Sequence, residues 1–348
     1  MLTVGVIGYG YWGPNLVRNF HSLPGSTVKY VCDLDVSRLA LAEQENPGIQ
    51  GIVDAEAVLA DPEVDIVAVA TPVTSHYRLT KAALEAGKHV FVEKPLAASS
   101  AEALEVTELA ARKNLVLQVD HTYVYSAPVR KIRSAIAGGE LGQILYVDSV
   151  RVNLGLFQET HSVIWDLAPH DLSIMMHILG RSVTSVSAVA IAHYDEFEQP
   201  HNMAYLTLYF EDGILGHVHV NWLAPVKVRR MMIGGTRRML LWDDVEPDEK
   251  VRIYEKSIAI DLTPEERYHS LVQYRLGDMV APRLENFEAL RAECAEFLAS
   301  IEDGRPVVSD GWFGTALVEV LEAADKSILR NGMRVEVEYR ARAAARFP

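Results

Sequence analysis

The chain has 348 residues, of which 49% are hydrophobic and 23% are charged, a composition typical of a globular protein with about two domains. It carries 47 acidic against 33 basic residues, and the net charge of −14 argues against nucleic acid as a partner. Two cysteines, Cys32 and Cys294, are too few for a disulfide framework or a cysteine-based zinc site. No apolar run is long enough to span a membrane and no signal peptide is recognisable, so we expect a cytoplasmic protein with no membrane partner.

Strand and helix patterns alternate over about the first 120 residues. The run at 65–70 is almost wholly apolar, as expected for a strand buried on both faces of a sheet. This alternation predicts βαβ units and a parallel sheet. We expect strands at 3–7, 28–32, 65–70, 89–92 and 115–119, and helices at 15–21, 37–45, 78–86 and, with Ser100 as N-cap, up to 113.

The second half of the chain has a different pattern. Apolar and polar residues alternate over 143–153, which predicts a strand, and Asp212-Gly213 predicts the turn of a hairpin. Few helices accompany these strands, so we expect an α+β domain with an antiparallel sheet, and domains at 1–122 and 123–348. The predicted strands are 143–153, 185–191, 203–210, 214–223, 226–233 and 238–242, and the predicted helices are 165–179, 286–302 and 312–329.

A glycine motif follows the first predicted strand directly and opens a helix. Gly8, Gly10 and Gly13 fit the spacing G-x-G-x-x-G, with Tyr11 and Trp12 in the second gap. The first glycine permits a tight turn, the second lets the backbone approach a pyrophosphate, and the third lets the helix pack on the strand. The helix N-terminus then offers N–H groups to the phosphates. The motif therefore predicts a Rossmann-type dinucleotide site; the alternative is a glycine-rich turn without a ligand.

An acidic residue at the end of the second strand sets the choice of cofactor. Asp33 lies 25 positions after Gly8, close to the spacing expected for a carboxylate that binds the ribose hydroxyls. Such a carboxylate repels a 2′-phosphate, so we expect NAD rather than NADP. Asp35 is the competing acid, but its place beyond the strand is typical of a helix start. Arg38 is a second candidate cofactor contact, because a nearby arginine can accommodate the 2′-phosphate of NADP.

Two further segments carry residues suited to proton transfer. Lys94 follows the strand at 89–92, and ligands bind at the carboxyl ends of parallel strands. Asp166 and His170 are four positions apart and share one face of a predicted helix, with His177 on roughly the same face. A histidine with a carboxylate and a lysine nearby can transfer protons near neutral pH. The alternatives are a solvated lysine, a structural helix face, or a metal site made by the helix residues; we expect no metal.

Three segments together resemble the Gfo/Idh/MocA family of oxidoreductases: the glycine motif, the sequence Ala-Thr-Pro-Val-Thr-Ser-His at 70–76, and Glu-Lys-Pro at 93–95. The resemblance covers residues 4 to about 335. It implies an NAD(P)-binding Rossmann domain, a second domain on an open antiparallel sheet, and oxidation or reduction of hydroxyls on sugars, inositols and their derivatives. It assigns catalysis to Lys94, Asp166 and His170, and it assigns the cofactor lining to Thr71, Pro72, His76, Glu93 and Lys94.

Within that family, the segments at 120–125, 153–155, 165–171 and 222–227 are most similar to the branch found in nucleotide-sugar pathways. This branch implies oxidation at C3 of a UDP-linked sugar or reduction of a 3-keto sugar on dTDP. One departure is Val-Ile-Trp at 163–165, where many members have glycines, and this change is expected to alter substrate shape more than chemistry. The substrate-binding residues implied by the resemblance are Tyr123, Arg151, Asn153, Trp165 and His170.

The predicted hairpin has one polar and aromatic face. Alternation places His217 and His219 on that face, with Tyr205 and Tyr209 opposite them on the neighbouring strand. This is more aromatic surface than a lone exposed sheet is expected to carry, so we predict a homodimer or homotetramer formed through this face. A solvated face or a ligand floor are the alternatives. The basic segment 227–230 is suited to a diphosphate, to solvent or to a subunit contact.

The leading function is therefore an NAD-dependent dehydrogenase of a sugar, most specifically of a nucleotide-linked sugar. A dehydrogenase of a free sugar or inositol is the nearest alternative. A non-catalytic NAD-binding redox sensor is the alternative from another class, and the joint presence of Lys94, Asp166 and His170 argues against it. Sequence leaves open whether Lys94 or His170 is the immediate base.

Overall fold

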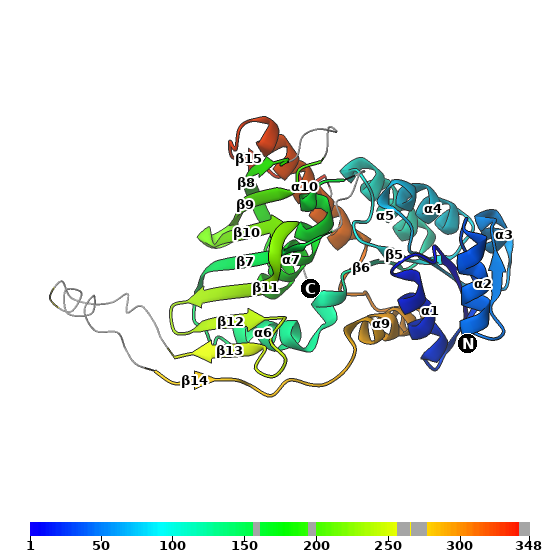
Figure 1. The fold of residues 1–348 in the computed structure, drawn as a ribbon, viewed down its shortest axis with the longest axis horizontal. Coiled ribbons are helices and arrows are strands. Elements are labelled where there is room, and N and C mark those ends of the chain that lie inside the picture. Colours follow the sequence, from blue (N-terminus) through cyan, green and yellow to red (C-terminus); the bar gives the residue numbers. More distant parts are fainter. Residues whose placement is uncertain (156–160, 194–199, 256–264, 266–276, 341–348) are drawn as a thin grey trace. The chain divides into compact units, whose positions relative to one another are not determined.

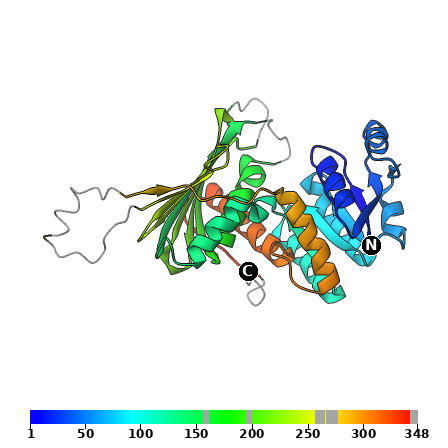
Figure 2. The same cartoon turned by 90° about the horizontal axis from the view of Figure 1, so that it is seen from below.

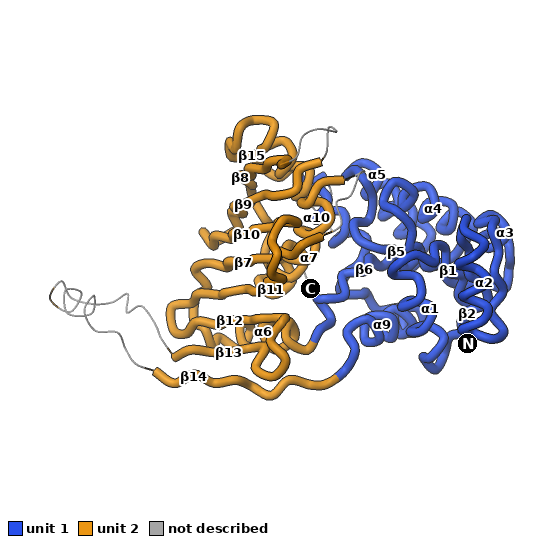
Figure 3. Tube along the Cα trace, in the orientation of Figure 1, with its two compact units in different colours: residues 1–126, 287–319, 339–346 blue, residues 127–286, 320–338, 347–348 orange. Residues whose placement is uncertain are grey.

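The computed structural model describes residues 1–155, 161–193, 200–255, 265 and 277–340. The chain forms two compact units (Figure 3). The first consists mainly of residues 1–126 and 287–319, and the second mainly of residues 127–286 and 320–338. No helix among the described residues is long and apolar enough to cross a membrane.

The first unit is built on a six-stranded parallel sheet in the order β3-β2-β1-β4-β5-β6. The strand order reverses between β1 and β4, and in such sheets ligands bind at this point, beyond the carboxyl ends of the strands. Sequence therefore predicted the class of this unit correctly. The strands are β1 (Leu2–Ile7), β2 (Ser26–Cys32), β3 (Gln50–Ile52), β4 (Ile66–Val69), β5 (His89–Glu93) and β6 (Leu117–Asp120), and the helices between them are α1 (Gly13–Ser22), α2 (Val36–Glu45), α3 (Ala55–Ala60), α4 (Val73–Glu85) and α5 (Ser100–Lys113).

A helix from late in the chain completes this unit. Helix α9 (Ala289–Asp303) lies beside α1 (Figure 1). The ring of Phe297 on α9 meets Phe20 of α1 and Phe91 of β5, with ring centroids 5.6 to 6.3 Å apart and edge-to-face. All three rings are fully buried. The first unit thus differs from the continuous domain of 1–122 predicted from sequence, because part of its core is supplied by α9.

The second unit is built on a nine-stranded sheet in the order β14-β13-β12-β11-β7-β10-β9-β8-β15. It is mixed rather than purely antiparallel, because β10 pairs with β7 in parallel. The predicted hairpin at Asp212-Gly213 is confirmed by the antiparallel pairing of β9 and β10, and Asp212 and Gly213 have φ angles of 62° and 78°. The strands are β7 (Ile144–Leu154), β8 (Val183–Ile191), β9 (Met203–Phe210), β10 (Leu215–Asn221), β11 (Leu223–Gly235), β12 (Met239–Asp243), β13 (Val251–Tyr254), β14 (Met279–Val280) and β15 (Val335–Glu336).

Helices cover one face of this sheet (Figure 2). Helix α7 (Val163–Leu179) packs against β7, β9 and β10, and α6 (Ala127–Ala137) packs against α7. The alternation predicted for the hairpin is confirmed. Tyr205 lies opposite His219 and Leu215 opposite Tyr209 on the polar face, and the apolar residues of the other face are fully buried: Leu206, Leu208, Val218, Val220 and Trp222.

Some local boundaries differ from the predictions. Helix α4 begins at Val73 rather than 78, because Pro72 stands immediately before it as the N-cap residue and fixes the chain direction. The N-cap of α5 is Ser99, not Ser100; its hydroxyl accepts a hydrogen bond from the N–H of Glu102. The short elements α3 and β3 were not predicted, and neither was helix α6, although its buried residues Val129, Ile132 and Ala135 recur at helical spacing. The last long helix, α10 (Gly311–Leu329), begins in the first unit and ends in the second.

Candidate active site

The glycine motif forms the turn between β1 and α1. Gly8 has a φ angle of +98°, and a Cβ atom there would lie 2.4 Å from the carbonyl oxygen of Ala70. A Cβ on Gly13 would lie 2.2 Å from the carbonyl oxygen of Gly8, whereas one on Gly10 would meet nothing closer than 3.7 Å. Gly8 and Gly13 are thus required by packing, and Gly10 leaves open space beside the backbone. No side chain caps α1, so its N-terminal turn fits a phosphate.

Asp33 lies directly beyond the last residue of β2, as predicted. Its carboxylate accepts hydrogen bonds from the N–H of Tyr9 at 2.7 Å and of Asp35 at 2.9 Å, and Arg38 lies 3.5 Å away. Asp35 caps α2 by accepting from the N–H of Ser37, which confirms it as a helix-start acid and lowers the pKa of its carboxyl. Because Arg38 also contacts Asp35, its charge is shared between two carboxylates. This arrangement fits the ribose of NAD.

The loops after β4 and β5 are tied together by a buried histidine. The ring nitrogens of His76 lie 2.7 Å from the carbonyl oxygen of Thr71 and 2.8 Å from that of Pro95. Burial lowers the pKa of His76, and the two carbonyl contacts act in the opposite direction. His76 therefore links the segment at 71–72, just beyond β4, to the segment that carries Lys94, and the peptide bond between Lys94 and Pro95 is cis.

Asp120 and Glu293 are site residues that sequence analysis did not single out. Asp120 ends β6, next to Glu93 at the end of β5. Its carboxylate accepts a hydrogen bond from the indole N–H of Trp12 at 2.7 Å, which links it to the glycine motif. Glu293 on α9 accepts from the N–H of His121 at 3.1 Å. The only sequence signal was the position of Asp120 at a strand's carboxyl end, because α9 is distant in sequence.

In the second unit, Asp166 and His170 lie one turn apart near the start of α7, and both are half-buried. The indole N–H of Trp222, just beyond β10, donates to Asp166 at 3.1 Å. A Cβ on Gly155 would lie 2.8 Å from the ring of Trp222, so this position has little room for a side chain. Packing and a hydrogen bond together fix the carboxylate of Asp166.

The predicted substrate residues have different surroundings. Arg151 is 3% exposed and its guanidinium donates to both carboxylate oxygens of Asp171, at 2.7 and 3.3 Å. The indole of Trp165 donates to Asp325 at 2.7 Å. Asn153 on β7 and Tyr123, in the short helix Thr122–Tyr125, are half-buried. A contact of any of these residues with a substrate stays a prediction.

His177 does not share the surroundings of His170. It is buried, its Nε2 lies 3.3 Å from Arg133, and burial, with the neighbouring arginines, lowers its pKa to about 3. It is therefore a neutral partner of α6. No group of three or more His, Cys, Asp or Glu among the described residues is arranged to hold a metal ion. In the basic segment, Arg229 and Arg230 pair with Asp244 and Asp243.

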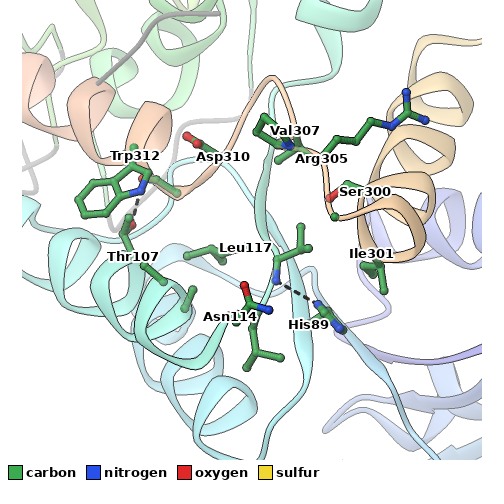
Figure 4. A pocket seen from close by; sticks show the side chains of 17 residues that line it. His89, Thr107, Asn114, Leu117, Ser300, Ile301, Arg305, Val307, Asp310 and Trp312 are labelled. Carbon is green, nitrogen blue, oxygen red and sulfur yellow. Dashed lines mark hydrogen bonds between the residues drawn. The ribbon is translucent and has the colours of Figure 1, made fainter. Parts of the chain in front are cut away.

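A cavity of about 330 Å³ lies at the opposite edge of the first sheet (Figure 4). It is lined by His89 at the start of β5 and Leu117 at the start of β6, with Asn114, Ser300 and Trp312 around them. None of the predicted site residues lines it. The structure thus places the predicted cofactor residues at the carboxyl edge of the first unit. Lys94 belongs to that unit and Asp166 and His170 to the second, so their meeting stays a prediction.

The parallel sheet, its glycine turn and the carboxylate of Asp33 just beyond β2 are typical of an NAD-binding Rossmann domain of an oxidoreductase. Family models agree: "Oxidoreductase family, NAD-binding Rossmann fold" matches residues 2–121, and "GFO/IDH/MocA C-terminal domain" matches residues 129–241. The chain belongs to the Gfo/Idh/MocA family.

Proteins similar to this chain act on different compounds. The chain is 26% identical to scyllo-inositol 2-dehydrogenase (NAD(+)) of Bacillus subtilis, over 98% of this chain and 96% of the relative. Among solved structures, UDP-N-acetylglucosamine 3-dehydrogenase GnnA from Acidithiobacillus ferrooxidans has a TM-score of 0.81 at 24% identity, covering 94% of this chain and 97% of that one. Levoglucosan dehydrogenase in complex with NADH and levoglucosan has a TM-score of 0.84 at 21% identity, covering 97% and 99%. These likenesses show that the chain shares the fold of these dehydrogenases.

Proposed function

We propose that the protein is an NAD-dependent dehydrogenase that acts on the C3 hydroxyl of a nucleotide-linked sugar, UDP- or dTDP-linked. The observation that carries the catalytic assignment is the pair Asp166 and His170 on one face of α7, with Asp166 held by the indole of Trp222. A carboxylate four positions before a histidine on a helix can orient the imidazole or stabilise its protonated form. Lys94, at the carboxyl end of β5, supplies a cation from the cofactor side.

Bound NAD supplies a hydride acceptor at C4 of its nicotinamide ring. Gly8, Gly10 and Gly13, with Tyr11 and Trp12, would hold its phosphates, and Asp33 its ribose. In alcohol oxidation, His170 accepts the hydroxyl proton while Asp166 stabilises the charged imidazole. Lys94 stabilises the developing alkoxide, or takes the proton itself. Whether His170 or Lys94 takes the proton, it stays on the protein when the carbonyl product forms.

The nucleotide-sugar assignment is supported by the segments at 120–125, 153–155, 165–171 and 222–227. A second candidate, oxidation of an inositol or a free sugar, is favoured by the likeness to the inositol dehydrogenase along almost the whole chain. The two differ in the size of the substrate. A nucleotide-linked sugar needs room and donors for a diphosphate, whereas an inositol needs only a small polar site.

The experiment is a substrate panel followed by NADH absorbance. The purified protein is incubated with NAD and with UDP-sugars, dTDP-sugars, free sugars or inositols. We expect the highest kcat/KM with one of the nucleotide sugars, and a 3-keto product identified by mass spectrometry after deuteride reduction. Turnover of an inositol or free sugar with none of any nucleotide sugar would replace the proposal by the second candidate. NAD binding without turnover of any compound would favour the sensor.

We also propose that the polar face of the second sheet joins copies of the chain. On this face Tyr205 stacks on His219 at 4.3 Å, and Tyr205 and Leu215 remain 39% and 43% exposed. Val189 and Ile191 on β8 are exposed too. Light scattering at micromolar concentration is expected to give the mass of a dimer or tetramer. A monomeric mass would contradict this proposal.

A further inference from the structure

Three carboxyl groups meet inside the first unit, at the carboxyl edge of its sheet. We call Glu93 of β5, Asp120 of β6 and Glu293 of α9 the carboxylate cluster. Asp120 and Glu293 are 2% and 0% exposed, and one carboxyl oxygen of Glu93 is buried. Glu93 and Asp120 are register partners on neighbouring strands, and Glu293 accepts from the N–H of His121, the residue after Asp120. Three ionised carboxylates cannot be buried in contact, because each loses its hydration and repels the others.

Hydrogen-bond donors are unevenly shared among the three carboxyl groups. Asp120 accepts from the indole of Trp12 at 2.7 Å, from the N–H of Thr122 at 3.1 Å and from the hydroxyl of Thr122. One oxygen of Glu293 accepts from the N–H of His121 at 3.1 Å, whereas its other oxygen and one oxygen of Glu93 are buried without a donor. Burial, and then the charge of Asp120, raise the pKa of both glutamic acids well above the usual range.

Unpartnered polar atoms around the cluster are the second observation. As ionised groups, Glu93 and Glu293 each retain a buried oxygen without a donor. The side-chain oxygen of Gln118 and both ring nitrogens of His121 are also buried without partners. A proton on each glutamic acid turns an unsatisfied acceptor into a donor. The arrangement therefore fits a site that holds protons, and it is not explained by packing alone.

Other titratable groups surround the cluster. Lys94 opposes the raised pKa of Glu93, and His121 is neutral because burial lowers its pKa to about 4. Tyr125 and Cys294 are neutral, because burial raises the pKa of both well above the usual range. Glu296 lies near Tyr125 and accepts from the N–H of Val308. The groups of the cluster whose pKa is raised are thus the two buried glutamic acids, and Lys94 is a cation that acts on Glu93.

The cluster is joined to the cofactor site at two points. Trp12, which holds Asp120, belongs to the glycine motif, and Glu93 directly precedes Lys94. NAD⁺ carries a positive charge on its nicotinamide ring and NADH carries none. A positive charge at the carboxyl edge of the sheet favours ionised carboxyls, and its loss favours protonated ones.

We propose that the carboxylate cluster of Glu93, Asp120 and Glu293 binds a further fraction of a proton when the protein holds NADH instead of NAD⁺. In alcohol oxidation the C–H bond breaks and its electron pair leaves as hydride to C4 of the nicotinamide. The O–H bond breaks, the C=O bond forms, and one proton is released to the protein. The cluster retains part of that proton, and the remainder passes to solvent. This inference rests on NAD binding and not on the identity of the sugar.

The test measures cofactor binding without any substrate. Dissociation constants of NAD⁺ and NADH are determined by calorimetry between about pH 6 and pH 8, because the proposed proton transfer takes place near neutral pH. If the NADH complex holds about half a proton more than the NAD⁺ complex, the ratio of the two dissociation constants changes about threefold per pH unit. NADH binding is then favoured at low pH. Titrations in buffers of different ionisation enthalpy give the same proton difference directly. The pyrophosphate and riboses are common to both cofactors and cancel in the ratio.

The variant Glu293→Gln keeps the size of the side chain and an oxygen that can accept from the N–H of His121, but it cannot titrate. We expect it to bind both cofactors with a pH slope of the ratio reduced by about half, because one of two titrating groups is lost. Glu302→Gln, on the same helix but exposed, is the matched control and is expected to leave the slope unchanged.

A pH-independent ratio in the wild type would overturn the inference, whatever the substrate panel shows. An unchanged slope in Glu293→Gln would show that Glu293 takes up none of the proton and would also overturn the inference. If Glu293→Gln fails to fold by circular dichroism, Glu93→Gln and the wild-type slope provide the test. Loss of binding of both cofactors by the folded wild type would instead contradict NAD binding itself, so the two failures are distinguishable.

Discussion

The two units of the chain place their predicted site residues by different means. In the first, the cofactor site is formed largely by backbone: a turn that only glycine can make, a bare helix N-terminus and strand ends brought to one edge. In the second, the carboxylate of Asp166 is held by a side-chain contact with Trp222, just beyond β10. Backbone geometry is specific to a cofactor class and side-chain packing is specific to one enzyme. This is why the cofactor is known here while the substrate is proposed.

The largest expected effect tests whether the two halves act as one site. Lys94→Ala, from the first unit, and His170→Ala, from the second, are each expected to lower kcat by about 10²–10⁴-fold, the usual scale for losing an acid–base group. NAD affinity should change little. The double variant should lose less than the product of the two effects. Stopped-flow kinetics on the best substrate measure this; near-normal turnover in either folded variant would remove that residue from the mechanism.

The next effect concerns stability in the second unit. Asp171→Asn leaves the buried guanidinium of Arg151 without its counter-charge, and removal of one partner of a buried ion pair costs about 3–5 kcal/mol. Denaturant unfolding measures the loss. The exposed pair of Arg181 and Asp212 supplies the control, because Asp212→Asn is expected to cost less than about 1 kcal/mol. Equal losses in the two variants would show that Arg151 is not held by Asp171.

In the first unit, two glycines of one motif should respond differently. Gly8→Ala places a Cβ against the carbonyl of Ala70 at a positive φ, so we expect a loss of about 1–3 kcal/mol in unfolding free energy. Gly10→Ala meets no close atom and should leave stability nearly unchanged while weakening NAD binding. Thermal unfolding measures the loss of stability in each variant, and calorimetry measures its NAD binding. Equal destabilisation would contradict the packing role of Gly8.

Asp33→Ala should weaken NAD binding by about 1.5–3 kcal/mol, the scale of hydrogen bonds to a charged group. The same variant should narrow the preference for NAD over NADP, because the carboxylate no longer repels a 2′-phosphate. Arg38→Ala is the comparison, since Arg38 contacts Asp33 from the solvent side. Wild-type protein that binds NADP as tightly as NAD would refute the role assigned to Asp33.

The smallest effect is a pH dependence of stability. Glu293 keeps its proton in the folded state to a higher pH than its usual pKa of 4.5, so the unfolded chain binds fewer protons above that value. Its contribution to stability is therefore present at low pH and falls as pH rises toward the folded pKa. The unfolding free energy of Glu293→Gln relative to wild type should rise with pH by up to about 1.4 kcal/mol per unit. A constant difference would mean that Glu293 is ionised in the fold.

The glycine motif, Asp33 and the pair on α7 were predictable because each is a local pattern: a fixed spacing, a strand end, one helical turn. The fold class followed from the same local alternation. Glu293 was not predictable, because its contact with the N–H of His121 joins residues 172 positions apart. The partner of Asp166 could not be read either, since nothing local connects Trp222 to α7. The parallel pair of β10 and β7 likewise depends on register between distant strands.

The return of α9 to the first unit has a consequence for synthesis of the chain. When the ribosome has made the segment that matches the Rossmann family model, residues 2–121, the rings of Phe20 and Phe91 still lack Phe297. Asp120 likewise lacks Glu293 until most of the second unit has been translated. The N-terminal unit therefore finishes folding late, and a fragment that ends near residue 122 exposes an aromatic core surface prone to aggregation.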